Sequence, residues 1–275
     1  MAGLPQRARD SIRPVSSVAI FTLVQDEPEF LPVWKAHYAP AGDVYILDHE
    51  SSPPVEGGIA LHHKWSWDFT WWHDMAQRFQ EALFEAGYQT VVFATPDEFL
   101  VPIHVPLVDY FRRYSHGAVV RPTAYDIVDM SRASPGYDLL DTPVGVVYHD
   151  DKDGFLDWTS SRPWEDRRWW VRCSSYDKPL ILREPYRWSW GLHSTRDDDP
   201  RPESDLRLLH LHRVDYESGK VRHARKRLRL NHKDITEFGS GAHNLLTEEP
   251  AYNQWFYHDV AFRERTPWTL HARAD

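Results

Sequence analysis

Short apolar runs alternate with helix-like segments over the first hundred residues, and this alternation constrains the fold more than any other feature. Four runs are predicted strands, three of them rich in β-branched residues: Val18–Val24, Asp43–Leu47, Ile59–His63 and Thr90–Ala94. Glu29–Tyr38 and Asp68–Ala86 carry apolar residues at helical spacing, and Gly87 stands where a helix-ending glycine belongs. The order strand, helix, strand, strand, helix, strand predicts an α/β fold whose mostly parallel sheet is flanked by helices.

The second half of the chain is less regular. Three further segments resemble strands: Ala118–Arg121, Pro143–Tyr148 and Pro179–Leu182. The loops between them are rich in Trp, Asp and Arg, and no clear linker divides the chain. We therefore predict one domain over residues 18–260, with a flexible tail at 1–17 and another at 261–275.

Composition excludes several classes of protein. The 275 residues are 41% hydrophobic and 27% charged, which is typical of a globular protein and not of a disordered one. No apolar run reaches the roughly 20 residues that span a bilayer, and the first residues lack the apolar core of a secretory signal. A formal charge of -9 argues against a dedicated nucleic-acid binder. Cys173 is the one cysteine, so an internal disulfide is excluded and a reducing cytoplasm is the expected location.

Three carboxylates mark the end of the predicted strands. Asp26, Asp48 and Asp97 each follow an apolar run. The carboxyl ends of parallel strands meet at one edge of a sheet, where ligands of such folds bind. We therefore expect the three side chains to line one edge, either as ligand contacts or as loop caps.

Five blocks of sequence, in order, resemble bacterial glycosyltransferases of the family 2 type. The blocks cover residues 18–38, 43–53, 87–102, 162–193 and 206–217. They include an apolar strand followed by a Phe-Leu and Trp-His pattern, a strand followed by Asp-x-x-Ser-Ser, and TPDEFLVP in place of the metal-binding Asp-x-Asp segment. The resemblance implies a GT-A fold, with a nucleotide-sugar half at 18–117 and an acceptor half at 118–260.

The same resemblance implies transfer of a sugar from a nucleotide-diphosphate donor to a glycan or small-molecule acceptor. It also implies a divalent cation, Mn²⁺ or Mg²⁺, which would neutralise the leaving diphosphate. The chain departs from the family at Asp26, where Asn is usual, and at Thr95, where the first Asp of the metal motif is usual. Asp97 is thus the expected metal ligand and the central catalytic residue.

A histidine from late in the chain is expected to join Asp97. The candidates are His193, His210 and His212, and His212 is favoured for its place in His-Leu-His-Arg. His210 and His212 are two residues apart, so on a strand both would point to the same side. Core packing or hydrogen bonding is the alternative role for each.

The remaining site candidates are assigned by the same resemblance and by residue chemistry. Asp26, Glu27 and Asp48 are expected at the nucleotide, and Arg168 at its diphosphate. Asp157 and Asp215 are candidates for a general base, which an inverting enzyme needs. The two remaining candidates are acceptor-stacking residues, with core packing as the alternative: Trp188 and Trp190.

Other functions stay open at this stage. The altered motif also fits a metal-independent variant of the fold or a non-catalytic carbohydrate- or nucleotide-binding protein. A nucleotidyltransferase is disfavoured, because this sequence has no Gly-rich phosphate loop after its first predicted strand. The stretch 220–233 holds seven Lys or Arg in fourteen residues. One interpretation is a peripheral contact with a polyanion, either anionic lipid at the inner face of the membrane or a polyanionic glycan. The other is a solvated helix face.

Overall fold

The computed structural model describes residues 4–63, 68–113, 117–129, 146–148, 169–173, 176–189, 192, 201–230, 245–246, 248–253 and 255–256. The chain divides into two compact units. The first unit comprises Met1–Thr123 and Asp177–Leu208, and the second comprises Ala124–Tyr176 and Leu209–Asp275. We predicted one domain with halves at 18–117 and 118–260. In the structure, the first unit extends to Thr123 and also includes the later segment Asp177–Leu208.

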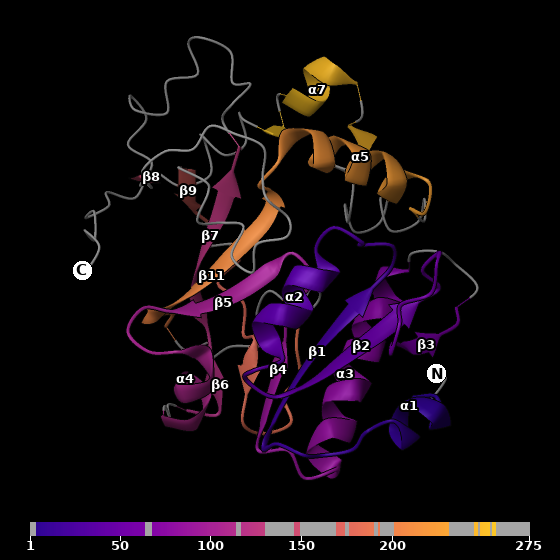
Figure 1. Ribbon diagram of the computed structural model, residues 1–275, viewed down its shortest axis with the longest axis vertical. Helices are drawn as coiled ribbons and strands as arrows, with labels where there is room; N and C mark the ends of the chain where they lie inside the picture. The colour runs from indigo at the N-terminus through magenta and orange to yellow at the C-terminus, as the bar shows by residue number, and fades with distance from the viewer. Residues whose placement is uncertain are drawn as a thin grey trace. The chain divides into compact units, whose positions relative to one another are not determined.

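The first unit is built on a six-stranded mixed sheet with the order β3-β2-β1-β4-β10-β6 (Figure 1). Its strands are β1 (Val18–Val24), β2 (Asp43–His49), β3 (Ile59–Leu61), β4 (Thr90–Phe93), β6 (Val119–Val120) and β10 (Ile181–Leu182). The four strands from β3 to β4 are parallel, and β10 is antiparallel to both β4 and β6. The predicted α/β class and the four early strands are thereby confirmed.

The core of this unit follows from the register of its strands. Phe21 lies beside Tyr45 on β2 and beside Phe93 on β4. Helix α3 (Phe69–Glu85) packs Phe79 onto this row, with ring centroids 5.3 Å from Phe21 and 5.7 Å from Tyr45. Every residue of β1 is buried, as expected for a central strand covered on both faces.

The other helices of the first unit are short. They are α1 (Gln6–Asp10), α2 (Leu31–Tyr38) and α4 (Leu107–Arg113). Helix α1 lies in the segment that was expected to be a flexible tail. Ala8 on this helix is buried, as are Leu4 before it and Ile12 after it, so apolar residues spaced four apart in a polar stretch contribute to the core.

Strands β7 (Pro122–Val128) and β11 (Glu203–Arg213) each run from one unit into the other. In the first unit, β5 (Glu98–Pro102) is joined to the start of β11, where the Ile103 amide donates to the Asp205 carbonyl at 2.9 Å. In the second unit, β7 pairs antiparallel with β9 (Trp169–Arg172), which pairs with β8 (Val146–Tyr148). Helices α5 (Tyr216–Arg227) and α7 (Glu249–Asn253) complete the described part of that unit.

Helix α5 and the residues after it form an aromatic core in the second unit. Tyr216, Tyr252 and Phe256 pack with ring centroids 5.2 to 5.6 Å apart. Gly219 faces Tyr252 so closely that an added Cβ would lie 2.5 Å from its hydroxyl, which explains a glycine inside a helix. Among the described helices, none combines the length and the apolar character needed to cross a bilayer.

Candidate metal and nucleotide site

The predicted edge of carboxylates exists in the first unit. Strands β2, β1 and β4 are parallel neighbours, so their carboxyl ends lie at one edge of the sheet. Asp48 is the penultimate residue of β2, Asp26 follows β1 by two residues, and Asp97 lies between β4 and β5. The three side chains differ in what they contact, and these contacts separate structural from ligand-binding roles.

Asp48 is used as a loop cap. Its carboxylate accepts the amides of Ser51 at 3.0 Å and Val55 at 2.9 Å, and the residue is 2% exposed. Two backbone donors from its own loop satisfy both oxygens. This is the alternative role that the sequence left open for a residue expected at the nucleotide.

Asp26 joins the same loop from β1. Its amide donates to the Ser51 hydroxyl at 2.9 Å, and its carboxylate accepts the amide of Ser52. Asp26 has φ of 48°, a left-handed conformation that Asp and Asn tolerate better than most residues. Both Asp and Asn suit this position, so the departure from the family pattern at Asp26 leaves the backbone geometry intact. Glu27, the neighbouring residue that was also expected at the nucleotide, is buried, with 6% of its surface exposed.

The turn that carries Asp97 is held from several sides. The Glu98 amide donates to the Thr95 carbonyl at 2.9 Å, while the Glu98 carboxylate accepts the Thr95 amide at 2.9 Å. Thr95 in turn donates its hydroxyl to the Asp97 carboxylate at 2.8 Å. Thr95 stands where the first Asp of the Asp-x-Asp motif is usual, and its hydroxyl orients the Asp97 carboxylate.

Glu98 is fixed by a buried ion pair. Its side chain is fully buried and lies 2.5 Å from the ammonium of Lys178, whose side chain is 9% exposed. The Tyr38 hydroxyl donates to the Glu98 carbonyl at 3.0 Å and accepts the Leu100 amide at 2.9 Å. Burial raises the pKa of Tyr38 well above its ordinary value, so the phenol stays protonated as that donor. Sequence analysis missed Glu98 and Lys178 as supports of Asp97, although both lie in blocks that carried the resemblance.

The second unit contributes a chain of polar side chains. On β11, His210 Nδ1 lies 2.9 Å from Asp126 Oδ1, and His210 Nε2 lies 3.0 Å from His212 Nδ1. Arg213 donates to the other oxygen of Asp126 at 2.7 Å and is fully buried. The alternation of β11 puts His210 and His212 on one side of the strand, as the i, i+2 spacing predicted.

Aromatic rings hold both imidazoles in place. The Tyr176 ring centroid lies 4.1 Å from that of His210, and Trp255 stacks on His212 at 5.4 Å with an interplanar angle of 28°. The Arg213 guanidinium lies over the same Trp255 ring at 4.4 Å. Contacts of this kind restrict the rotamers of the histidines before any ligand binds.

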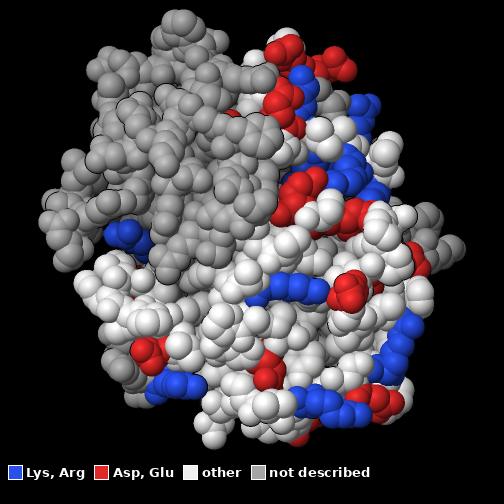
Figure 2. Space-filling model, in the orientation of Figure 1, with Lys and Arg blue, Asp and Glu red and all other residues white. Residues whose placement is uncertain are grey.

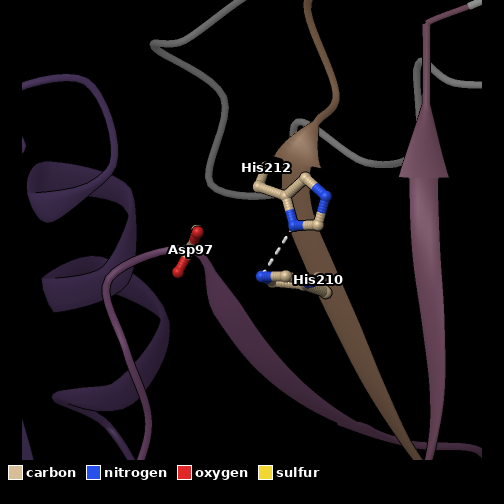
Figure 3. Close-up of side chains that lie close together, drawn as sticks. All are labelled: Asp97, His210 and His212. Atoms are coloured by element: carbon tan, nitrogen blue, oxygen red, sulfur yellow. Dashed lines mark hydrogen bonds between the residues drawn. The ribbon is translucent and has the colours of Figure 1, made fainter. Parts of the chain in front are cut away.

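Asp97 in the first unit, and His210 and His212 in the second, are side chains that could hold a metal ion. Each offers one ligand atom, a carboxylate oxygen or an imidazole nitrogen (Figure 3). Asp97 is 5% exposed, His210 is 6% exposed and His212 is half-buried. That Asp97 and His212 ligate one metal ion stays a prediction, and His210 is a further candidate ligand.

Two other predicted residues have structural contacts. Trp188 is 4% exposed, packs on Phe93 with ring centroids 5.7 Å apart and donates its indole N–H to the Pro179 carbonyl at 2.9 Å. The predicted acceptor platform is therefore wrong for Trp188, because its ring is in the core. Asp215 caps α5, where its carboxylate accepts the Ser218 amide at 2.8 Å. The remaining candidates lie outside the described residues: Asp157, Arg168, Trp190 and His193.

The basic stretch 220–233 begins within α5. Arg222 is buried, and Arg225, Lys226 and Arg227 lie in the last turn, where cations offset the helix dipole. On the face drawn in Figure 2, basic and acidic residues are interspersed. The peripheral contact with an anionic surface stays a prediction, which sedimentation with anionic vesicles at low and high salt would test.

Compared with protein-family models and with curated proteins, the sequence gives no match to either.

Proposed function

We propose that this chain is a GT-A-type glycosyltransferase that moves a sugar from a nucleotide-diphosphate donor to a glycan or small-molecule acceptor. One observation carries the proposal: Asp97 follows a central parallel strand at the edge where ligands of such sheets bind, and Thr95 orients its carboxylate. The order of the sequence blocks supports it, as does the edge formed by Asp26, Asp48 and Asp97 at the carboxyl ends of β1, β2 and β4.

The candidate ligands, two imidazole nitrogens and one carboxylate oxygen, bear on which divalent cation could bind. Imidazole nitrogens suit first-row transition metals, the series that begins with Mn²⁺, and Mn²⁺ also takes carboxylate oxygens. Mg²⁺ prefers a set of oxygen ligands, and these residues offer it a single carboxylate. Of the two cations that the resemblance implies, Mn²⁺ is therefore the better match.

A bound cation would supply Lewis-acid stabilisation of the diphosphate as it leaves. The chain contributes the geometry that this chemistry needs. Thr95 orients the Asp97 carboxylate, while Glu98 and Lys178 hold the backbone of the turn. Since these contacts exist before a ligand arrives, little of the binding free energy is lost to ordering the site.

A thermal-shift screen tests this proposal. The purified protein is melted with UDP, GDP, CDP or dTDP, each with and without Mn²⁺, and with Asp97→Asn as the matched variant. A ligand that binds the folded state raises the Tm by mass action. We expect one nucleotide to raise the Tm of the wild type only with Mn²⁺, and to have no such effect on Asp97→Asn.

Two outcomes would replace the proposal. A shift that is equally large in EDTA would indicate the metal-independent variant of the fold. No shift with any nucleotide, together with no release of nucleoside diphosphate from nucleotide sugars, would indicate a non-catalytic binding protein.

A further inference from the structure

The second unit contains a buried carboxylate, that of Asp126, in direct contact with His210. Asp126 lies on β7, is buried, and divides its two oxygens between His210 and Arg213. The guanidinium of Arg213 only donates and stays charged, so the oxygen that it contacts is an acceptor. Because the fully buried charge of Arg213 requires a counter-charge and lies 2.7 Å from this carboxylate, Asp126 is ionised and its other oxygen is also an acceptor.

The position of the His210 proton follows from this arrangement. An ionised carboxylate can only accept, so His210 Nδ1 must carry the hydrogen that it shares with Asp126. In the neutral ring, Nε2 then bears a lone pair. His212 Nδ1 lies 3.0 Å from that lone pair and donates to it when no cation is bound (Figure 3).

We infer that Asp126 is a positioning residue that keeps the proton of His210 on Nδ1, so that Nε2 presents a lone pair. His210 Nε2 would then be the atom that holds a cation, in place of the hydrogen bond between the two rings. A carboxylate behind a ligating histidine is known to fix its tautomer and to increase the basicity of its free nitrogen. The role in cation binding rests on the proposed function, whereas the position of the proton does not.

Replacing Asp126 with Asn exposes this role because the amide has a single oxygen. Arg213 is fully buried and can only donate, so it requires that oxygen. The amide nitrogen is then directed at His210 Nδ1 and makes it an acceptor. The proton of a neutral His210 moves to Nε2, the atom that the cation needs.

The first experiment determines the tautomers directly. Long-range proton–nitrogen NMR spectra of protein labelled with ¹⁵N-histidine distinguish Nδ1–H from Nε2–H. His210→Gln assigns the signals. We expect Nδ1–H for His210 in the metal-free wild type and Nε2–H in Asp126→Asn. Nε2–H in the wild type would overturn the inference, and this measurement requires no variant at residue 126 to fold.

The second experiment measures Mn²⁺ affinity by calorimetry. We expect Asp126→Asn to weaken binding by about 10- to 100-fold, the range seen when the partner of a ligating histidine is changed. Asp129→Asn is the matched control, because Asp129 follows the same strand, is buried, and accepts the Tyr216 amide at 3.1 Å. It should bind Mn²⁺ as the wild type does.

The outcomes separate the two claims. Wild-type affinity in Asp126→Asn, with Asp97→Asn impaired, would overturn the role of Asp126 and leave the metal site intact. Absence of Mn²⁺ binding in the wild type would overturn the metal site, while the NMR spectra still decide whether Asp126 sets the tautomer of His210.

Discussion

The loops after β2 and β4, the strands on either side of β1, lie at the same edge of the sheet, yet they use their aspartates in opposite ways. In the β2 loop, the Asp48 carboxylate accepts backbone amides of its own loop. In the β4 loop, Glu98 accepts the backbone amide of Thr95, and Asp97 accepts the side-chain hydroxyl of Thr95. A second carboxylate, that of Glu98, thus caps the turn that carries Asp97.

This difference explains why position in the sequence alone did not separate the two residues. Both follow apolar strands at the same edge, and both are nearly inaccessible, at 2% and 5% exposure. What distinguishes them is the residue that follows: Glu98 next to Asp97, with Lys178 to neutralise it. The comparison predicts that substitutions in the β2 loop affect stability, and that those in the β4 loop also affect the site.

The largest effect on stability is expected from Lys178→Met. This change leaves the fully buried Glu98 carboxylate without its nearest cation, and breaking a buried pair in this way typically costs about 3–5 kcal/mol. Urea unfolding monitored by tryptophan fluorescence would measure the loss.

The double variant Lys178→Met/Glu98→Gln controls for packing, because it removes the charge as well as its partner. We expect it to recover most of the lost stability. If Lys178→Met unfolded at the urea concentration of the wild type, Glu98 would not depend on Lys178, and the account of the β4 turn would be wrong.

A smaller effect is expected from Asp48→Ala. The buried amide of Ser51 and the partly buried amide of Val55 lose their acceptor, which should cost about 1–3 kcal/mol. The affinity for Mn²⁺ should not change. Loss of nucleotide binding at unchanged stability would show instead that Asp48 contacts the nucleotide, as the sequence resemblance implied.

The smallest effect concerns a third carboxylate, at the opposite end of β2. Burial acts to raise the pKa of Asp43, but hydrogen bonds from the Ser16 amide, the Tyr88 hydroxyl and the Val15 amide outweigh it and lower that pKa below its ordinary 3.8. A lowered pKa stabilises the fold above about pH 3.8, and this contribution is lost as the pH falls through the folded-state value.

Asp43→Asn should therefore lose less stability than the wild type between about pH 4 and pH 2, as measured by thermal melts across that range. Parallel curves for the two proteins would show that the Asp43 hydrogen bonds do not favour its ionised form.

Much of the first unit could be predicted from sequence because its signals are local. Strands β1 to β4 are nearly continuous apolar runs, and α3 has a clear apolar stripe with an Asp68 cap. The later strands were harder. β11 alternates exposed and buried residues only in its first part, and its partners come from segments about eighty residues away in the chain.

The candidate site could be predicted only in part, for a related reason. The resemblance pointed to Asp97 and His212, but it said nothing of Asp126 or Lys178, whose roles depend on contacts between distant segments. Trp188 illustrates the opposite error. Its i, i+2 spacing with Trp190 suggested a stacking platform, whereas contacts with Phe93 and Pro179 place it in the core.

The measurement that tests the central claim most directly is a calorimetric titration of Mn²⁺ into the wild type, Asp97→Asn and Asp48→Ala. We predict one binding site in the wild type, an affinity at least about tenfold weaker in Asp97→Asn, and an unchanged affinity in Asp48→Ala. Equal affinity in the wild type and Asp97→Asn would contradict the claim that the β4 loop, and not the β2 loop, provides the metal ligand.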